Sequence, residues 1–382
     1  MPPAVTDILI FADSIVSPEM RHEVPVIIPD PFLHAEKDGK RYSFSTAFEV
    51  ERLAEAGIEA HAWEEIGYDE LLEQGLPRDE IVWHQLNVNA CRELGIDEAT
   101  VPRSFPVSTA DFLRENGITL NPDYTYFADR RRVKNEAELE GIRRAQKAAE
   151  AGMGAAKEML GRAEASNGTV TLDGKPLTSE MLKAEIRRVF TEQGTTCDDF
   201  IVAHGAQTAI GHDLGSGPIA PDEPIVIDVW PRDPETGCFA DMTRTYVVGT
   251  PSDELVEYHR LVKEALDQSF EATKAGVPGV DVYDLVCDLF EEHGQKTSHS
   301  KKPGEVLNSG FFHGLGHGVG LEVHEAPSLG RGGTGELLAG DVITLEPGLY
   351  RAGYGGCRLE DLVVVTKDGA ENLTDFPYDL QP

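Results

Sequence analysis

Hydrophobic positions along the first third of the chain follow two different spacings. Short apolar or β-branched runs at 7–12 and 24–28 predict strands, and the runs that open at 80 and 107 predict further strand segments. The stretch 44–56 instead repeats apolar residues every three or four positions, which predicts an amphipathic helix. Strands that alternate with helices indicate an α/β domain.

The rest of the chain contains longer helical periods. Asn135 precedes one of them, and its side chain is suited to accept hydrogen bonds from the first amides of a helix that reaches about Leu160. Further helices are predicted from 178 onward, over 253–273 and over 282–294. Strand patterns lie between them, so the whole chain is expected to be of the α/β (α+β) class.

A basic segment at 129–135 separates these two patterns and is interpreted as a solvated hinge. We therefore expect an N-terminal domain over 1–133 and a second domain over 134–382.

Four carboxylates lie inside or beside strongly apolar strand patterns. Asp228 and Asp241 are joined by a turn rich in proline and glycine, and so are Glu346 and Glu360. Each pair is therefore predicted to lie on a hairpin, which can place two acids on one face of a sheet. Four acids in such places suggest a metal centre rather than four independent structural carboxylates.

A glycine-rich segment at 310–325 carries His313, His317 and His324. Repeated glycines disfavour a helix and favour an irregular strand that can approach a ligand closely. On a regular strand His324 would point away from the other two, so their convergence requires a bend or bulge. His204 and His212 lie earlier in the chain, and His204 is interpreted as structural.

The composition of the chain limits the classes of molecule that it is expected to bind. The 382 residues carry a net charge of −33, from 34 basic and 67 acidic side chains. Nucleic acid and anionic membrane surfaces are therefore not expected as partners, because both require clustered Lys and Arg. Five scattered cysteines without a CxxC motif predict no disulfide framework and favour a reducing, cytoplasmic location.

Five segments in order, IDVW, ADMTRT, HGLGHGVGLEVHE, LEPGLY and RLEDLVVV, resemble the metallopeptidase family of Xaa-Pro dipeptidase (prolidase), aminopeptidase P and methionine aminopeptidase. The resemblance covers roughly 134–382. It implies the pita-bread fold, a pseudo-symmetric and mostly antiparallel sheet with helices outside. Residues 1–133 resemble, in position and size, the N-terminal domain of creatinase and prolidase. Trp230 departs from the family's pattern, which usually has a glycine after the first acidic strand.

The resemblance also implies two divalent metal ions per chain. Manganese is favoured, with cobalt, zinc or iron as alternatives, because carboxylates and one imidazole suit these ions. The implied ligands are Asp228, Asp241, His317, Glu346 and Glu360, with Asp241 and Glu360 shared between the ions.

Catalytic and substrate-binding roles follow from the same resemblance. Glu346 is implied to move a proton between water and the leaving nitrogen, and His324 to stabilise the oxyanion. His212 is implied to lie near the scissile nitrogen, and His313 in the pocket for proline. Arg358 is expected either to bind a substrate carboxylate or to brace the ligands.

Several activities fit these residues. The preferred hypothesis is a dipeptidase acting on a substrate with proline in second position. The alternative is Xaa-Pro aminopeptidase activity on longer peptides, which must leave the substrate's C-terminal end open. A creatinase-like relative or a non-catalytic module is disfavoured because all five ligand positions are filled. The resemblance also implies a homodimer, and Thr243 is expected to support Asp241.

Overall fold

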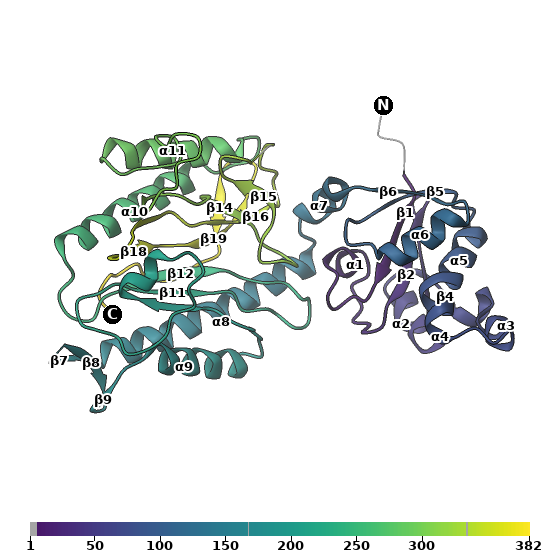
Figure 1. Cartoon of the computed structure of the whole chain (residues 1–382), viewed down its shortest axis with the longest axis horizontal. Helices are drawn as coiled ribbons and strands as arrows, with labels where there is room; N and C mark the ends of the chain where they lie inside the picture. The colour runs from purple at the N-terminus through teal and green to yellow at the C-terminus, as the bar shows by residue number, and fades with distance from the viewer. Residues whose placement is uncertain (1–5, 167, 334) are drawn as a thin grey trace. The chain divides into compact units, whose positions relative to one another are not determined.

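The computed structural model describes residues 6–166, 168–333 and 335–382. Contacts within the chain divide it into two units, 1–131 and 132–382, and many of their elements are labelled in Figure 1.

Unit 1 is built on a six-stranded mixed sheet in the order β4-β3-β2-β1-β5-β6. The first three strands pair antiparallel, and the outer pairs β3–β4, β1–β5 and β5–β6 are parallel. The strands are β1 Ile8–Ala12, β2 Phe32–Lys37, β3 Lys40–Ser45, β4 Glu59–Ala62, β5 Glu98–Val101 and β6 Thr119–Pro122. The helices are α1 Pro18–Glu23, α2 Val50–Glu55, α3 Tyr68–Glu73, α4 Arg78–Glu80, α5 Leu86–Leu94, α6 Val107–Glu115 and α7 Tyr124–Arg132, with short helical turns at Ala47–Glu49, Trp63–Ile66 and Ile81–Gln85.

Three strand predictions for this unit are wrong. Residues 24–28 form no strand, because their backbone bonds with Ser14: its hydroxyl donates to the Val26 carbonyl at 2.6 Å and accepts from the Ile28 amide at 2.7 Å. The runs at 80 and 107 are helical. Short apolar runs suit a buried helix as well as a strand, so periodicity alone did not separate them. The helix predicted over 44–56 begins only after β3 ends.

Unit 2 contains four long helices. They are α8 Glu136–Gly161, α9 Ser179–Glu192, α10 Asp253–Ala272 and α11 Gly279–Glu292. Asn135 caps α8 as predicted: its side chain accepts the Glu138 amide at 2.9 Å, and the Glu138 carboxylate accepts the Asn135 amide at 3.0 Å. This reciprocal capping box satisfies amides that the helix itself leaves unpaired.

Strands of unit 2 pair antiparallel throughout its described residues. Four sheets have the orders β10-β11-β12, β13-β17-β18, β15-β14-β16-β19-β20 and β7-β8-β9. The strands are β7 Glu164–Ser166, β8 Thr169–Leu172, β9 Lys175–Pro176, β10 Ile201–His204, β11 Ile225–Val229, β12 Met242–Tyr246, β13 Ser309–Gly310, β14 Gly316–Gly318, β15 Glu325–Leu329, β16 Val342–Leu345, β17 Gly348–Arg351, β18 Gly355–Arg358, β19 Asp361–Val365 and β20 Ala370–Asn372.

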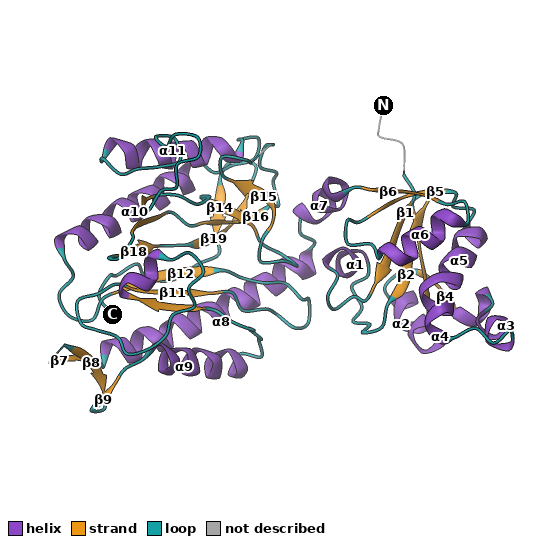
Figure 2. Ribbon diagram, viewed as in Figure 1, coloured by secondary structure: helices purple, strands orange, loops and turns teal. Residues whose placement is uncertain are grey.

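Helices cover the strands of unit 2 from two sides (Figure 2). Residues of α8 and α9 share one apolar core with β10–β12, and residues of α10 and α11 share another with β16–β19. The predicted acids lie in or directly beside strands of these two cores, namely β11, β12, β16 and β19. Within the described chain, no helix is both long enough and apolar enough to cross a membrane.

Candidate active site

Two neighbouring hairpins bring the four predicted acids together. Asp228 lies in β11, and Asp241 immediately precedes β12, its hairpin partner. Glu346 follows β16 and Glu360 precedes β19, which pairs with β16. The Glu360 amide donates to the carbonyl of Thr243 at 3.1 Å and thereby links the hairpins.

The glycine-rich segment bends as the convergence of its histidines requires. The β14–β15 pairing changes register between His317 and Gly318, which is a bulge. A side chain at Gly316 would meet the Thr344 carbonyl oxygen at 2.0 Å, so only glycine permits this close approach. The rings of His317 and His324 lie 4.3 Å apart between centroids. Both histidines therefore reach the same pocket.

We call Asp228, Asp241, Glu346, Glu360 and His317 the acidic floor, and His212, His313 and His324 the histidine rim. His317 Nε2 lies 3.5 Å from Glu346 Oε1 and 3.8 Å from Asp241 Oδ2. Ligand atoms of Asp241, His317 and Glu360 all lie within 4.8 Å of one another. This spacing suits a shared cation.

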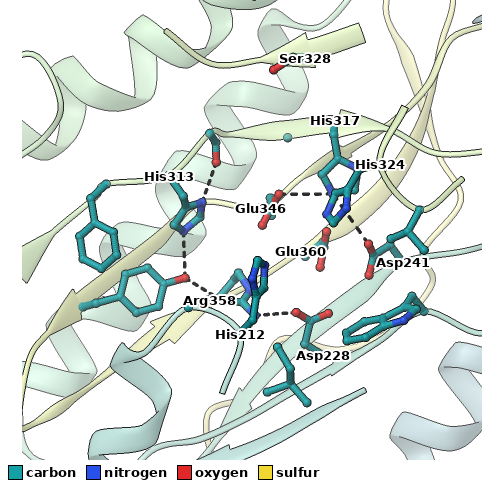
Figure 3. Close-up of a pocket in the computed structure, with 18 of the residues that line it drawn as sticks. His212, Asp228, Asp241, His313, His317, His324, Ser328, Glu346, Arg358 and Glu360 are labelled. Carbon is teal, nitrogen blue, oxygen red and sulfur yellow. Dashed lines mark hydrogen bonds and ion pairs between the residues drawn. The ribbon is translucent and has the colours of Figure 1, made fainter. Parts of the chain in front are cut away.

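All nine predicted site residues, including Arg358, line one pocket of about 740 Å³ (Figure 3). Sequence reasoning did not assign a role to several other lining residues. Apolar and aromatic side chains form much of the remaining wall: Ile201, Leu214, Trp230, Phe312, Val323 and Tyr350.

Arg358 is held in a buried chain of hydrogen bonds. It donates from Nη2 to Asp228 Oδ2 at 2.6 Å and from Nη1 to the Tyr350 hydroxyl at 2.9 Å. The Tyr350 hydroxyl lies 3.0 Å from His313 Nε2, and His313 Nδ1 donates to the Gly314 carbonyl at 2.7 Å. A neutral His313 therefore accepts from Tyr350. Of the two roles expected for Arg358, the structure shows the second, because its guanidinium braces Asp228. Sequence analysis did not predict Tyr350 as a site residue, and the only signal for it was its place on the strand after Glu346.

Thr243 supports a different acid from the one predicted. Its hydroxyl donates to Glu360 Oε2 at 2.6 Å, whereas Asp241 Oδ1 accepts the Met242 amide at 3.0 Å. The register explains this result, because Thr243 is bridged to Glu360 across the two hairpins.

Burial shifts the pKa values of the pocket's carboxyls and imidazoles in opposite directions. Desolvation, reinforced by neighbouring carboxylates, raises the pKa of Asp241 and Glu360 well above their usual range. Burial raises the pKa of Glu346 to about 8. Burial lowers the pKa of His313 to about 3 and that of His317 to about 4. Each group is thus driven towards its neutral form.

The floor fits divalent cations. Asp228 Oδ1 is buried and has no hydrogen-bond partner among the described residues, although Oδ2 is paired with Arg358. A buried carboxylate oxygen without a partner is costly, and a cation would satisfy it. Carboxylates and one neutral imidazole are ligands for hard or borderline metals, and no cysteine lines the pocket.

Comparison with known proteins agrees with this geometry. The model of metallopeptidase family M24 matches residues 140–367. An Xaa-Pro dipeptidase of Pyrococcus horikoshii is 32% identical over 253 residues, which cover 66% of this chain and 65% of that protein. One from Pyrococcus furiosus is 31% identical over 253 residues, 66% of each protein. The chain thus spans just under two thirds of these relatives' length.

Solved structures show the same fold over nearly the whole chain. The prolidase of Pyrococcus horikoshii has a TM-score of 0.76 at 23% identity, covering 98% of this chain and 95% of that one. An X-Pro aminopeptidase of Thermotoga maritima has a TM-score of 0.77 at 22% identity, covering 98% and 97%.

Proposed function

Because the chain belongs to metallopeptidase family M24 and has its pita-bread fold, we propose that it is an Xaa-Pro dipeptidase that hydrolyses the bond before proline. The convergence of four carboxylates and His317 on the floor of one pocket carries this proposal. The names of the two Pyrococcus relatives support the substrate class.

Two divalent ions, manganese first among the candidates, would be held by Asp228, Asp241, His317, Glu346 and Glu360. Asp241 and Glu360 would serve both ions, and Thr243 would orient Glu360 through its hydroxyl. When bound, the ions would polarise the scissile carbonyl and lower the pKa of water. Arg358 would keep Asp228 aligned while leaving its Oδ1 free for an ion.

Proton transfer falls to Glu346, whose carboxylate lines the pocket and lies 3.5 Å from His317 Nε2, where it would reach both a water and the leaving nitrogen. His324 has a lowered pKa because of burial and is uncharged at neutral pH, so its N–H can donate to the developing oxyanion. His212 lies on an exposed loop that lines the same pocket and would contact the substrate near the scissile nitrogen.

The proline side of the substrate would lie against His313, Phe312 and Tyr350. Their rings contact one another, with centroids 5.3–6.4 Å apart. Such a wall suits a compact apolar ring. Arg358, which is hydrogen-bonded to Asp228, Tyr350 and Thr243, would attract a free carboxylate through its positive charge, which favours the dipeptidase over the Xaa-Pro aminopeptidase.

Hydrolysis of Leu-Pro and Leu-Ala by manganese-loaded protein tests the proposal. We expect Leu-Pro to be cleaved and Leu-Ala to be cleaved far more slowly. Equal rates on the two dipeptides, or no cleavage of either, would overturn it.

We further propose a cytoplasmic homodimer whose residues 1–133 form the creatinase-like domain. The five cysteines are all unpaired, which suits a reducing compartment. In the resembled family the N-terminal domain helps to form dimers, and Val16 and Phe48 of unit 1 are 79% and 73% exposed. Light scattering tests the assembly, and a monomer that stays active at high dilution would contradict it.

A further inference from the structure

One histidine closes the base of the loop that carries His212. His204, the last residue of β10, lies with Nδ1 2.6 Å from Glu223 Oε1 and with Nε2 3.0 Å from the Ser216 carbonyl oxygen. The intervening segment 205–215 includes His212 and three other residues that line the pocket. His204 therefore joins the two ends of this loop.

Both partners of His204 are hydrogen-bond acceptors. The Ser216 carbonyl has no hydrogen to donate, and Glu223 Oε1 already accepts the Ala220 amide at 2.7 Å. The imidazole must therefore donate from both nitrogens, which only the protonated ring can do. The hydrogen bond to Glu223 raises the pKa of His204, in agreement with the geometry.

Other side chains bind the backbone at the C-terminal end of the same loop, residues 215–217. Gln207 contacts both backbone groups of Ser216, and a side chain at Gly215 would meet the Val202 carbonyl oxygen at 1.8 Å. The charged groups that face the imidazole or bind the loop backbone are Glu223, Glu180 and Lys183 of α9, and Asp213. In contrast, Ile210 near His212 is 60% exposed. These contacts therefore hold the base of the loop, and the Ile210 side chain at its tip faces solvent.

We propose that protonated His204, held by Glu223, is a positioning residue that fixes the His212 loop over the pocket. A neutral imidazole has one N–H and can keep only one of the two contacts as a donor. The loop therefore loosens as pH rises through the raised pKa of His204. The hydrogen-bonded clasp does not depend on the proposed peptidase activity, whereas its effect on catalysis does.

Hydrogen exchange tests the clasp without substrate. Protection factors of the 209–217 amides are measured at pH 6 and pH 9 in the wild type, His204→Gln and Glu223→Gln. We expect protection to fall with pH in the wild type, and both variants to have already lost it at pH 6, on the order of tenfold for one charge-assisted hydrogen bond. His299→Gln is the control, because it removes a surface histidine–aspartate contact elsewhere. Unchanged protection in both variants would overturn the proposal.

The pH profile of kcat/KM tests the consequence for catalysis. A neutral amide in place of Glu223 removes the main cause of the raised pKa, so the alkaline limb should move to lower pH in Glu223→Gln. A uniform loss at every pH would indicate a merely structural role and contradict the inference. If no Xaa-Pro peptide is cleaved, the proposed function fails, and the exchange measurement still decides the clasp.

Discussion

The carboxylates of the acidic floor and the histidines of the rim share one pocket, but burial shifts their pKa values in opposite directions. The carboxylates of the floor lie on or beside β11, β12, β16 and β19, and desolvation raises the pKa values of three of them. The rim histidines lie in a glycine-rich segment or on a loop, and desolvation lowers the pKa values of His313 and His324.

This difference in pKa shift separates the residues whose ionisation state depends on a metal from those whose state does not. The floor becomes fully ionised only when cations replace the lost water, because like charges at close range oppose ionisation. Burial lowers the pKa values of His313 and His324, so these two rim histidines are neutral at pH 7 without a metal. Breaking the floor should therefore remove the metal, whereas breaking the rim should spare it.

Asp241→Ala is expected to have the largest effect. It removes a carboxylate that both ions would share, so metal content and Leu-Pro hydrolysis should fall together, by more than the ~10²–10³-fold typical of one lost transition-state donor. Elemental analysis of the purified variant and its hydrolysis rate check this. Wild-type metal content in the variant would exclude Asp241 as a ligand.

His324→Ala is expected to lower kcat by about 10²–10³-fold while the metals stay bound, as for loss of an oxyanion donor. His324→Gln, which keeps an N–H donor, should recover part of that loss. Kinetics and elemental analysis on the same samples make the test. A parallel loss of metal would show that His324 is a metal ligand and contradict this prediction.

Metal-free protein should lose stability as pH rises from 6.5 to 8. The folded pKa of Glu346 is about 8 against an ordinary value of 4.5, so the folded state binds this proton more tightly and its advantage disappears as pH rises. The buried histidines do not oppose this change, because their lowered pKa values confine their effect to pH below 6.5. We expect a loss of about 2 kcal/mol from one carboxyl over this window.

Thermal unfolding of chelator-treated protein across that window measures the effect. Glu346→Gln should flatten the pH dependence of the metal-free protein, and metal-saturated wild type serves as the second control. A pH dependence that is identical in all three samples would show that the floor carboxyls do not cause it.

Amidation of the C-terminus of Leu-Pro should have the smallest effect, a loss of at least ~1.5 kcal/mol in kcat/KM, the lower range for a hydrogen bond to a charged group. Arg358 is the group whose positive charge would attract the free carboxylate. Steady-state rates on the dipeptide, its amide and a Leu-Pro-Yaa tripeptide check this. Equal rates on all three would favour the Xaa-Pro aminopeptidase.

Sequence predicted the floor better than the rim. Apolar runs interrupted by single acids reveal strand carboxylates directly, and turn residues between them reveal the hairpins. Convergence of His317 and His324 depends on a bulge that glycines permit but do not locate. The partner of Thr243 depended on the register between two hairpins, which local pattern does not contain.

In unit 1 the limits were different. The apolar residues of 24–28 are bonded through Ser14 rather than through a neighbouring strand, so the composition is right for a strand but the pairing is absent. Short runs at 81–83 gave too few positions to distinguish a period of two from one of 3.6. The α8 boundary succeeded because a capping box is a local signal.

Stepwise return of metal to stripped protein tests the central claim, that the floor works only when it holds two divalent ions. Chelator-treated protein would be titrated with Mn(II) while bound metal and Leu-Pro hydrolysis are followed in the same samples. We expect no hydrolysis without metal and a plateau at two ions per chain. Full hydrolysis by metal-free protein would contradict it.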